Sequence, residues 1–373
     1  MILGMEGPMK KFWKALLLID SGLLILVGGY AAYVYLTYHR VPDNVKLKPV
    51  NRNSQILRTN HPYKAMTFNI GYAAYPDNYS FFTDGGKYSR AFSKLSVLDD
   101  LNGIYQAVEQ VDPTLMFFQE VDTNGDRSFH VNEVQWLKDR MSSYSSVYAQ
   151  NYDSAYLFYP LTRPIGKAWP GLLTLAKATI EDSTRYQLPI DTDFNKFMDL
   201  DRAISVTHIP VNNGRQLAVI NLHLSAFTKN AKVRKAQVRK LFAKMTTEQQ
   251  AGNYVIVAGD YNHDMLGNSP AVFHTTSKPM NWTHPFPADQ LPKGFRIAKQ
   301  GLAEAKVPSV RANGTPYQPE KTFTSVIDGF ILSDNVQVNR VHVKSLGFKN
   351  SDHNPEILDF ELKWSSIKNV STK

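Results

Sequence analysis

Short apolar runs that end abruptly in polar residues are the feature that most constrains the fold of this chain. They are AMTFNIG (65–71), TLMFFQEVD (114–122), QLAVINLHLS (216–225), YVIVAGDYNHD (254–264), SVIDGFILS (325–333) and EILDFEL (356–362). Each has the length and the β-branched or aromatic composition of a buried strand. The chain must therefore bury several strands, and it carries chemically capable side chains where those strands end.

Helical patterns separate the strand-like runs. Apolar residues recur at helical spacing over 95–108, and again over 231–245, where they alternate with a basic face. That basic face is either solvated or follows phosphate groups. Strands and helices mixed without strict alternation predict an α+β domain with sheets inside and helices outside. Because no linker-like break occurs, we expect one catalytic domain over 61–365 and a tail over 366–373.

The N-terminal part of the chain has a different character. Residues 15–38 contain no Lys or Arg and are long enough to cross a hydrocarbon layer of about 30 Å. Three lysines lie in residues 1–14, so that end is expected in the cytoplasm. The pattern predicts a single-pass signal anchor in the cell membrane, a short tether over 39–60 and an extracytoplasmic domain. A cleaved signal peptide and a buried core helix are the alternatives.

The composition restricts the possible chemistry. The chain has no cysteine, which excludes disulfides, thiolate catalysis, zinc fingers and iron–sulfur clusters. Any metal must therefore be bound by oxygen or imidazole ligands. Residues 1–44 contribute a net +1 to the formal charge of +9, so the remainder carries +8. This charge either favours a polyanion or an anionic surface, or serves ordinary solubility.

The polar residues at the strand ends form a candidate site. Each alone has a simpler explanation, such as a turn, a buried salt bridge or a satisfied core histidine. Together they supply hard oxygen ligands for Mg²⁺ or Mn²⁺ and imidazoles for proton transfer near neutral pH. Hydrolysis of a phosphate ester needs this combination. The residues are Asn69, Glu120, His223, Asp260, Asn262, Asp328, Asp352 and His353.

The order FNIG, FFQEVD, NLHLS, AGDYNHD, IDGFILS, SDHNP resembles the endonuclease/exonuclease/phosphatase superfamily. That superfamily includes pancreatic-type deoxyribonucleases, abasic-site endonucleases, inositol-polyphosphate phosphatases and bacterial sphingomyelinases. The resemblance runs from about residue 64 to 362. It implies a four-layer α/β sandwich, in which two packed β-sheets are flanked by helices, and metal-dependent hydrolysis of phosphodiester or phosphomonoester bonds.

The resemblance also implies a metal site. Glu120, with Asn69 nearby, would bind Mg²⁺ or Mn²⁺, and Asp352 would complete an acidic pocket. Gly71 stands where some relatives place an acidic ligand, which argues against a second metal of that kind. Phe68 replaces a tryptophan found in many relatives, a change that should preserve packing.

The remaining implied roles concern water and phosphate. Asp260 would orient or deprotonate the attacking water, and Asn262 would steady the phosphate. His223 and His353 would hydrogen-bond the phosphate and stabilise the transition state. Asp328 would hold His353 in the required tautomer.

Two arginines are candidate substrate-binding residues. Arg90 and Arg185 could bind a phosphate group, although a solvated position on the protein surface is the simpler explanation. The aromatic segment 71–82 could stack bases, contact a membrane or anchor loops in the core.

Two acidic segments resemble calcium loops, but neither meets the requirements. Residues 122–133 carry Arg127, and residues 191–202 carry Lys196, at the sixth position, where a turn glycine is needed. The second segment also ends in Arg202 instead of an acidic residue.

The substrate is left open by these patterns. We favour a nuclease-like phosphoesterase, because the charge of +8 suits a phosphate backbone. A phospholipid or sphingomyelin phosphodiesterase and a hydrolase of a small phosphorylated metabolite are alternatives. A catalytically inactive module that binds a surface is the rival from another class.

Overall fold

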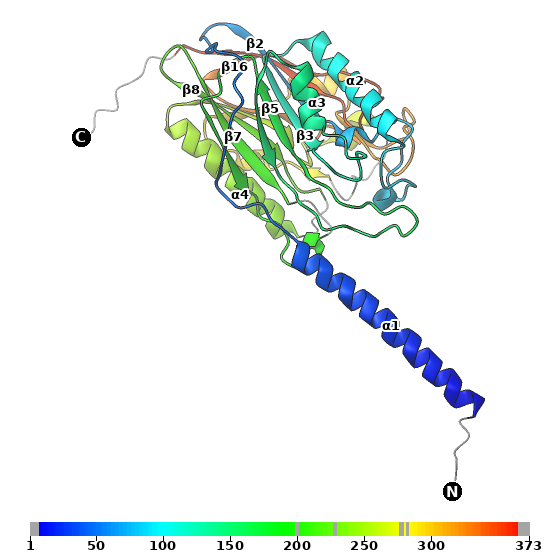
Figure 1. Cartoon of the computed structure of the whole chain (residues 1–373). Coiled ribbons are helices and arrows are strands. Elements are labelled where there is room, and N and C mark those ends of the chain that lie inside the picture. The colour runs from blue at the N-terminus through cyan, green and yellow to red at the C-terminus, as the bar shows by residue number, and fades with distance from the viewer. Residues whose placement is uncertain (1–6, 198–200, 227–229, 276–279, 281–282, 365–373) are drawn as a thin grey trace.

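Two β-sheets packed face to face form the centre of the molecule, and helices cover their outer faces (Figure 1). The computed structural model describes residues 7–197, 201–226, 230–275, 280 and 283–364. The predicted tail over 366–373 lies outside these residues. The predicted α+β fold, a four-layer sandwich of two sheets flanked by helices, is confirmed.

The first sheet has six strands in the order β16-β17-β2-β3-β5-β4. Its central pair, β2 and β3, is parallel, and the other neighbours are antiparallel. The strands are β2 (Pro62–Asn69), β3 (Leu115–Asp122), β4 (Ser145–Gln150), β5 (Pro170–Ala176), β16 (Val336–Val343) and β17 (Glu356–Leu362).

The second sheet has seven strands in the order β1-β6-β7-β8-β9-β15-β12. It also contains one parallel pair, β8 and β9. The strands are β1 (Val45–Leu47), β6 (Asp182–Gln187), β7 (Ala203–Pro210), β8 (Gln216–His223), β9 (Tyr254–Asp260), β12 (Phe295–Ala298) and β15 (Asp328–Ser333). Two short pairs lie apart from both sheets: β10 (His263–Asp264) with β11 (His284–Pro285), and β13 (Val310–Arg311) with β14 (Thr324–Ser325).

The helices divide between the two sides of the sandwich. On one side lie α2 (Lys94–Val111) and α3 (Glu133–Arg140), and on the other lies α4 (Ala231–Gln250) (Figure 1). Ser93 begins α2 with a capping box, which satisfies free N–H groups of the first turn. The shorter helices are α5 (Ser269–Phe273) and α6 (Leu302–Ala305), with 3₁₀ turns η1 (Gly71–Ala73), η2 (Phe82–Asp84), η3 (Phe194–Phe197) and η4 (Ala288–Gln290).

Strand alternation builds two hydrophobic clusters. Phe117 joins the cluster shared by both sheets and α4, whereas Phe118 joins the cluster beneath α2 and α3. Successive side chains of a strand point to opposite faces, so the apolar run of β3 is buried on both sides. Phe68, which replaces the expected tryptophan, is 1% exposed in the second cluster and preserves its packing.

A buried polar contact joins the two sheets. The Gln119 side-chain amide on β3 donates to the Asn221 amide oxygen on β8 at 2.8 Å, and both residues are fully buried. Asn221 in turn donates to Thr174 Oγ1 at 3.2 Å on β5. Because buried amides are costly unless they are hydrogen-bonded, this contact fixes how the sheets sit on each other.

The N-terminal helix α1 (Pro8–Thr37) projects away from the domain (Figure 1). Over Lys10–Thr37 it is long and apolar enough to cross a membrane, and none of its most apolar part is buried by the domain. The segment 39–60 differs from the expected short tether. It supplies the edge strand β1, which pairs with β6, and Val50 forms a bridge to Ser146. A three-residue strand shows no periodicity of its own and forms because β6 offers free edge groups.

We predict that the Gln119–Asn221 contact is energetically coupled. Asn221→Leu should lower the free energy of unfolding by about 2–3 kcal/mol, because the buried Gln119 amide loses its shortest hydrogen bond and keeps only longer ones to Thr67 Oγ1 and the Phe117 carbonyl. The double variant Gln119→Leu/Asn221→Leu should lose less than the sum of the two single variants. Chemical denaturation of the full chain in detergent, followed by tryptophan fluorescence, measures each value. Strict additivity would contradict the coupling.

Candidate active site

Strand topology brings the predicted residues to one edge of the sandwich. Parallel neighbours end at the same edge, so the register places His223 of β8 opposite Asp260 of β9, and Asn69 of β2 opposite Gln119 of β3. Antiparallel neighbours begin at that edge, which places Asp328 of β15 opposite Asp260.

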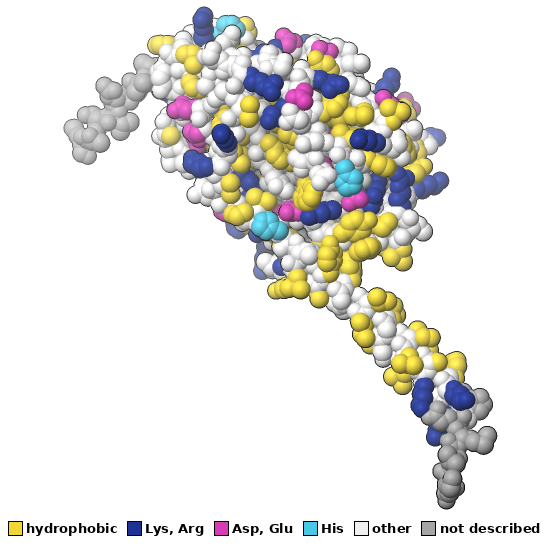
Figure 2. All heavy atoms as spheres, in the orientation of Figure 1, with side chains coloured by type: hydrophobic (Ala, Val, Ile, Leu, Met, Phe, Trp, Pro, Cys, Tyr) yellow, Lys and Arg dark blue, Asp and Glu magenta, His cyan; other side chains and the backbone are white. Residues whose placement is uncertain are grey.

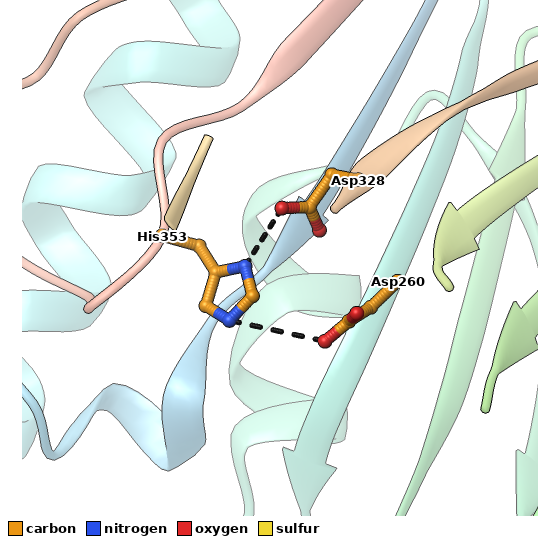
Figure 3. A group of neighbouring side chains, drawn as sticks. All are labelled: Asp260, Asp328 and His353. Carbon is orange, nitrogen blue, oxygen red and sulfur yellow. Dashed lines mark hydrogen bonds and ion pairs between the residues drawn. The ribbon is translucent and has the colours of Figure 1, made fainter. Parts of the chain in front are cut away.

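A histidine lies between two carboxylates in this cluster. His353 Nδ1 is 2.8 Å from Asp328 Oδ2, and its Nε2 is 3.8 Å from Asp260 Oδ2 (Figure 3). All three side chains are buried. Asp328 accepts a hydrogen bond from Nδ1 and thereby orients the ring with Nε2 toward Asp260. This is the role of Asp328 that the sequence resemblance implies.

Glu120 reaches the site through an irregularity in β3. The register of β3 against β5 shifts between Phe118 and Val121, and Glu120 has a positive φ of 55°. Such a bulge redirects a side chain toward the end of the sheet. Glu120 Oε1 lies 3.8 Å from His223 Nε2, which is also 3.5 Å from Asp260 Oδ2. The carboxylate of β3 and the imidazole of β8 therefore meet across the two sheets.

A cavity of about 320 Å³ opens beside this cluster. Six of the predicted residues line it: Glu120, His223, Asp260, Asn262, Asp352 and His353. Asn69 and Asp328 stand behind them as supports. The Asn69 amide nitrogen donates to Asp260 at 3.0 Å and approaches Glu120 at 3.4 Å. The cavity thus presents carboxylates and imidazoles to a ligand from several strands at once.

The two histidines differ in charge. Burial, followed by the charge of Arg202, holds the pKa of His223 well below its ordinary value, so this ring is neutral at neutral pH. Burial also lowers the pKa of His353, but the carboxylates of Asp328 and Asp260 outweigh it and raise the pKa to about 10. One ring therefore accepts hydrogen bonds or protons, and the other carries a positive charge.

The carboxylates of the site are held close together with little solvent. Burial and the charge of Asp328 raise the pKa of Asp260, and burial and the charge of Asp352 raise the pKa of Glu120. Nearby negative charges raise the pKa of a carboxylate because they destabilise its ionised form. A bound cation would stabilise that ionised form.

The residues present fit a divalent cation. Glu120 keeps 16% of its side chain exposed, and Asp260 adds carboxylate oxygen atoms to the same cavity wall. Asn69 turns its amide nitrogen toward both carboxylates. Asp260, Asp328 and His353 also offer ligand atoms that lie within 4.8 Å of one another. However, His353 Nδ1 is already bonded to Asp328, so the partly exposed carboxylate of Glu120 is the better candidate to hold a cation.

The position of Gly71 explains its departure from the pattern of relatives. Its φ is +53°, and a Cβ there would lie 2.9 Å from Asp352 Oδ1 and 2.8 Å from Tyr75 Cδ2. Asp352 itself accepts a hydrogen bond from Asn313 at 3.0 Å. An acidic side chain at position 71 therefore has no room, and Asp352 supplies the carboxylate in that region.

Three arginines that line the cavity were not predicted as site residues. Arg202 and Arg311 are fully buried, and Arg127 is half-buried. The Arg127 guanidinium donates to the Tyr75 hydroxyl at 2.7 Å and lies 4.2 Å from the centre of the Tyr72 ring. In the sequence, Arg127 and Arg202 are notable only as residues that break the calcium-loop pattern. The local sequence around an arginine in a loop does not indicate which groups it will contact in the fold. The aromatic segment 71–82 contributes Tyr72, Tyr75 and Phe81 to the cavity wall.

The two arginines proposed as phosphate clamps are used elsewhere. Arg185 is 1% exposed and donates to the carbonyl oxygens of Gln150 at 2.5 Å and Pro42 at 2.8 Å, so it fastens the start of the domain. Arg90 forms an ion pair with Asp126 at 2.9 Å. Neither lines the cavity.

The segment 122–133 is also not arranged as a calcium loop. The Asp122 carboxylate accepts hydrogen bonds from Thr123 N–H at 2.8 Å and from Ser128 Oγ at 3.0 Å. Residues 198–200 of the second acidic segment lie outside the described residues.

We predict that Asp328 sets the charge of His353. In Asp328→Asn the pKa of His353 should fall, because the charge that stabilises the imidazolium is removed, and the ring should lose its proton at a lower pH. NMR of histidine-labelled protein across pH 5–11 measures the titration. The matched control is Asp334→Asn, whose carboxylate is 73% exposed. An unchanged His353 titration in Asp328→Asn would contradict the assignment.

Comparison with known proteins supports the fold. No family model matches the sequence, and no curated protein matches it. Among solved structures, the chain is similar to an endonuclease/exonuclease/phosphatase from Beutenbergia cavernae, with 16% identity and a TM-score of 0.57 over 82% of this chain and 72% of that one.

Two further solved structures agree. They are D. rerio TDP2 complexed with single-strand DNA product (16% identity, TM-score 0.51, 81% and 100% covered) and ANGEL2, a 2′,3′-cyclic phosphatase (12%, 0.52, 86% and 99%). The chain therefore has the fold of the endonuclease/exonuclease/phosphatase proteins.

Proposed function

We propose that this protein is a divalent-metal-dependent phosphoesterase. The observation that carries the proposal is the convergence of Glu120, Asp260, a neutral imidazole and a positively charged imidazole on one cavity that is also lined by arginines. Acidic and basic groups that are buried together around one cavity are costly for folding and typical of catalytic sites.

The metal would be held by Glu120, with Asn69 and Asp352 as the further candidates. Mg²⁺ or Mn²⁺ would supply positive charge to the phosphate oxygens when bound. Asn69 at present uses its amide oxygen to accept the Gly71 N–H at 3.0 Å, but an amide oxygen has two lone pairs and retains one for a ligand.

The chain's own residues would move the protons. Asp260 accepts hydrogen bonds from Asn69 and from the Asn262 N–H at 2.8 Å, which fix its carboxylate toward the cavity. Its raised pKa makes it a base suited to a water molecule near neutral pH. His353, held by Asp328, would donate from Nε2 to a phosphate oxygen, and neutral His223 would orient the substrate.

Two arginines would balance the charge of the phosphate. Arg127 and Arg202 lie in the cavity wall, where a buried guanidinium interacts more strongly with an anion than it does in water. Tyr72 and Tyr75 hold the Arg127 group in place. The cation, the imidazolium and the guanidinium groups would together stabilise the transition state.

The solved neighbours support phosphate-ester chemistry. D. rerio TDP2 is complexed with a DNA product, and ANGEL2 is described as a 2′,3′-cyclic phosphatase. The nuclease preference from the sequence rests on the charge of +8, while the arginines of the cavity wall would suit any phosphate group. The proposal therefore concerns phosphate esters in general.

We predict that Glu120→Gln abolishes metal-dependent turnover. Full-length protein should hydrolyse bis(p-nitrophenyl) phosphate or p-nitrophenyl phosphate with Mg²⁺ or Mn²⁺, and EDTA should stop it. Glu120→Gln should reduce the rate by about 100-fold or more, because it keeps the shape of the side chain and removes its charge. Binding of Mn²⁺, followed by electron paramagnetic resonance, should weaken in the same variant.

The matched control is Glu109→Gln, an exposed carboxylate on α2 that accepts from Tyr105 at 2.6 Å and should leave turnover unchanged. Turnover that is insensitive to EDTA and to His353→Ala would refute the metal-dependent mechanism. A protein that hydrolyses no phosphate ester yet binds membranes or nucleic acid would favour the inactive surface-binding module.

We further propose that α1 anchors the enzyme in the cell membrane with the domain outside the cytoplasm. Lys10, Lys11 and Lys14 precede the apolar helix, which favours a cytoplasmic N-terminus. Protease added to intact cells should therefore remove the catalytic domain, and permeabilised cells should give the same fragments. Full protection in intact cells would reverse the orientation, and a mature chain lacking α1 would identify a cleaved signal peptide.

A further inference from the structure

One loop connects the cavity with the apolar helix. Residues 151–166, here called the 151–166 loop, link β4 to β5 and supply Tyr152, Ser154, Leu157 and Ile165 to the cavity wall. The same loop contacts α1, so the wall of the candidate site and the candidate membrane helix meet in one segment.

The contacts between the loop and α1 are specific. The Tyr30 hydroxyl donates to the Tyr156 carbonyl at 3.3 Å and accepts from the Phe158 N–H at 3.2 Å. The Tyr30 and Phe158 rings meet edge to face at 5.5 Å, and the Tyr33 hydroxyl accepts from the Tyr156 N–H at 3.3 Å. Tyrosines at the end of a membrane helix are typical of the interface with water.

The length of α1 sets the depth of these contacts. A hydrocarbon layer of about 30 Å takes ~20 helical residues, and counting from Lys14, the last lysine before the apolar part, this span ends near Val34. Val34 is 2% exposed and packs with Ala155 of the loop. Tyr30, Tyr33 and Val34 therefore place the 151–166 loop at the outer boundary of the membrane.

The tip of the loop is apolar and exposed. The exposed fractions are 51% for Phe158, 63% for Tyr159 and 85% for Leu161. Figure 2 shows hydrophobic side chains along α1 and on the adjoining surface of the domain. A cluster of exposed apolar side chains beside a membrane helix is covered most simply by the same bilayer.

We propose that the 151–166 loop dips into the outer surface of the membrane and that the cavity receives its substrate there, so the substrate is a lipid phosphate ester. This inference rests on the proposed phosphoesterase function and names its substrate class. A headgroup phosphate would enter past the loop while the acyl chains stay in the bilayer. The cavity suits such a ligand because it combines apolar loop residues such as Leu157 and Ile165 with the cations Arg127 and Arg202.

The positions of the arginines and of the loop tip favour a lipid substrate over a nucleic acid. Proteins that follow a phosphate backbone present lysines and arginines at the surface of a groove, where each neutralises a phosphate. Here Arg202 and Arg311 of the cavity wall are each 1% exposed and Arg127 is half-buried. The exposed residues of the loop tip carry no charge: they are Phe158, Tyr159, Leu161 and Thr162. A single phosphate that arrives from the membrane satisfies both observations.

The position of the 151–166 loop at the membrane can be measured without an activity assay. The chain has no cysteine, so Leu161→Cys provides a unique site for an environment-sensitive fluorophore. In full-length protein reconstituted in phosphatidylcholine vesicles, lipids that carry a spin label near the headgroup should quench this fluorophore. The control is Ile56→Cys, a 49% exposed position that precedes the bridge from Leu57 to Val211 beyond the far end of β7. Equal quenching at the two positions would overturn the placement.

The substrate class is tested in the same vesicles. Full-length protein with Mg²⁺ in vesicles of phosphatidylcholine, phosphatidylglycerol and sphingomyelin should release products detectable by mass spectrometry. Leu161→Glu should slow lipid turnover by about tenfold, because a charge opposes immersion of the loop, and should leave bis(p-nitrophenyl) phosphate hydrolysis within about twofold. Ile56→Glu should leave both rates unchanged.

The outcomes separate this inference from the proposed function. Hydrolysis of the chromogenic ester without any lipid turnover would overturn the lipid substrate and leave the phosphoesterase standing. Cleavage of DNA in place of lipid would assign a nucleic-acid substrate instead. Loss of both activities in Leu161→Glu would show that the loop supports the cavity itself and refute its role at the membrane. Hydrolysis of none of the esters would end both proposals.

Discussion

The arrangement of the whole site depends on how the two sheets are registered against each other. Gln119 and Asn221 join the sheets at 2.8 Å within the buried core. Glu120 follows Gln119 directly, and His223 comes two residues after Asn221 on the same strand. Because a hydrogen bond between buried amides tolerates little displacement, it also fixes the 3.8 Å approach of Glu120 to His223.

The second constraint is the electrostatic balance of a site that excludes most solvent. Several carboxylates meet there, and burial raises the pKa of both Glu120 and Asp260. His353 neutralises part of this negative charge, because its pKa is raised to about 10 and its ring stays protonated at neutral pH. The remaining negative charge is what a divalent cation would balance. Under the proposed function, this arrangement would receive a cation and a phosphate, at some cost to stability.

The N-terminal part of the chain belongs to the architecture of the site. The segment after α1 forms the edge strand β1, and Arg185 fastens it through the carbonyl oxygen of Pro42 at 2.8 Å. The last turns of α1 contact the 151–166 loop, which forms part of the cavity wall. These contacts limit the freedom of the helix relative to the domain, so the position of α1 beside the cavity follows from packing.

The sequence by itself determined the fold class and the polar residues of the strand ends, because strand periodicity and the residues that interrupt it are local properties. Asp260 and His353 could be predicted for this reason. Only the tertiary structure decided which arginines face the cavity: Arg127 and Arg202 line it, whereas Arg185 donates hydrogen bonds to backbone carbonyl oxygens. A guanidinium has the same local signature in each case, and its role is set by groups distant in the chain, which become neighbours only when the two sheets pack.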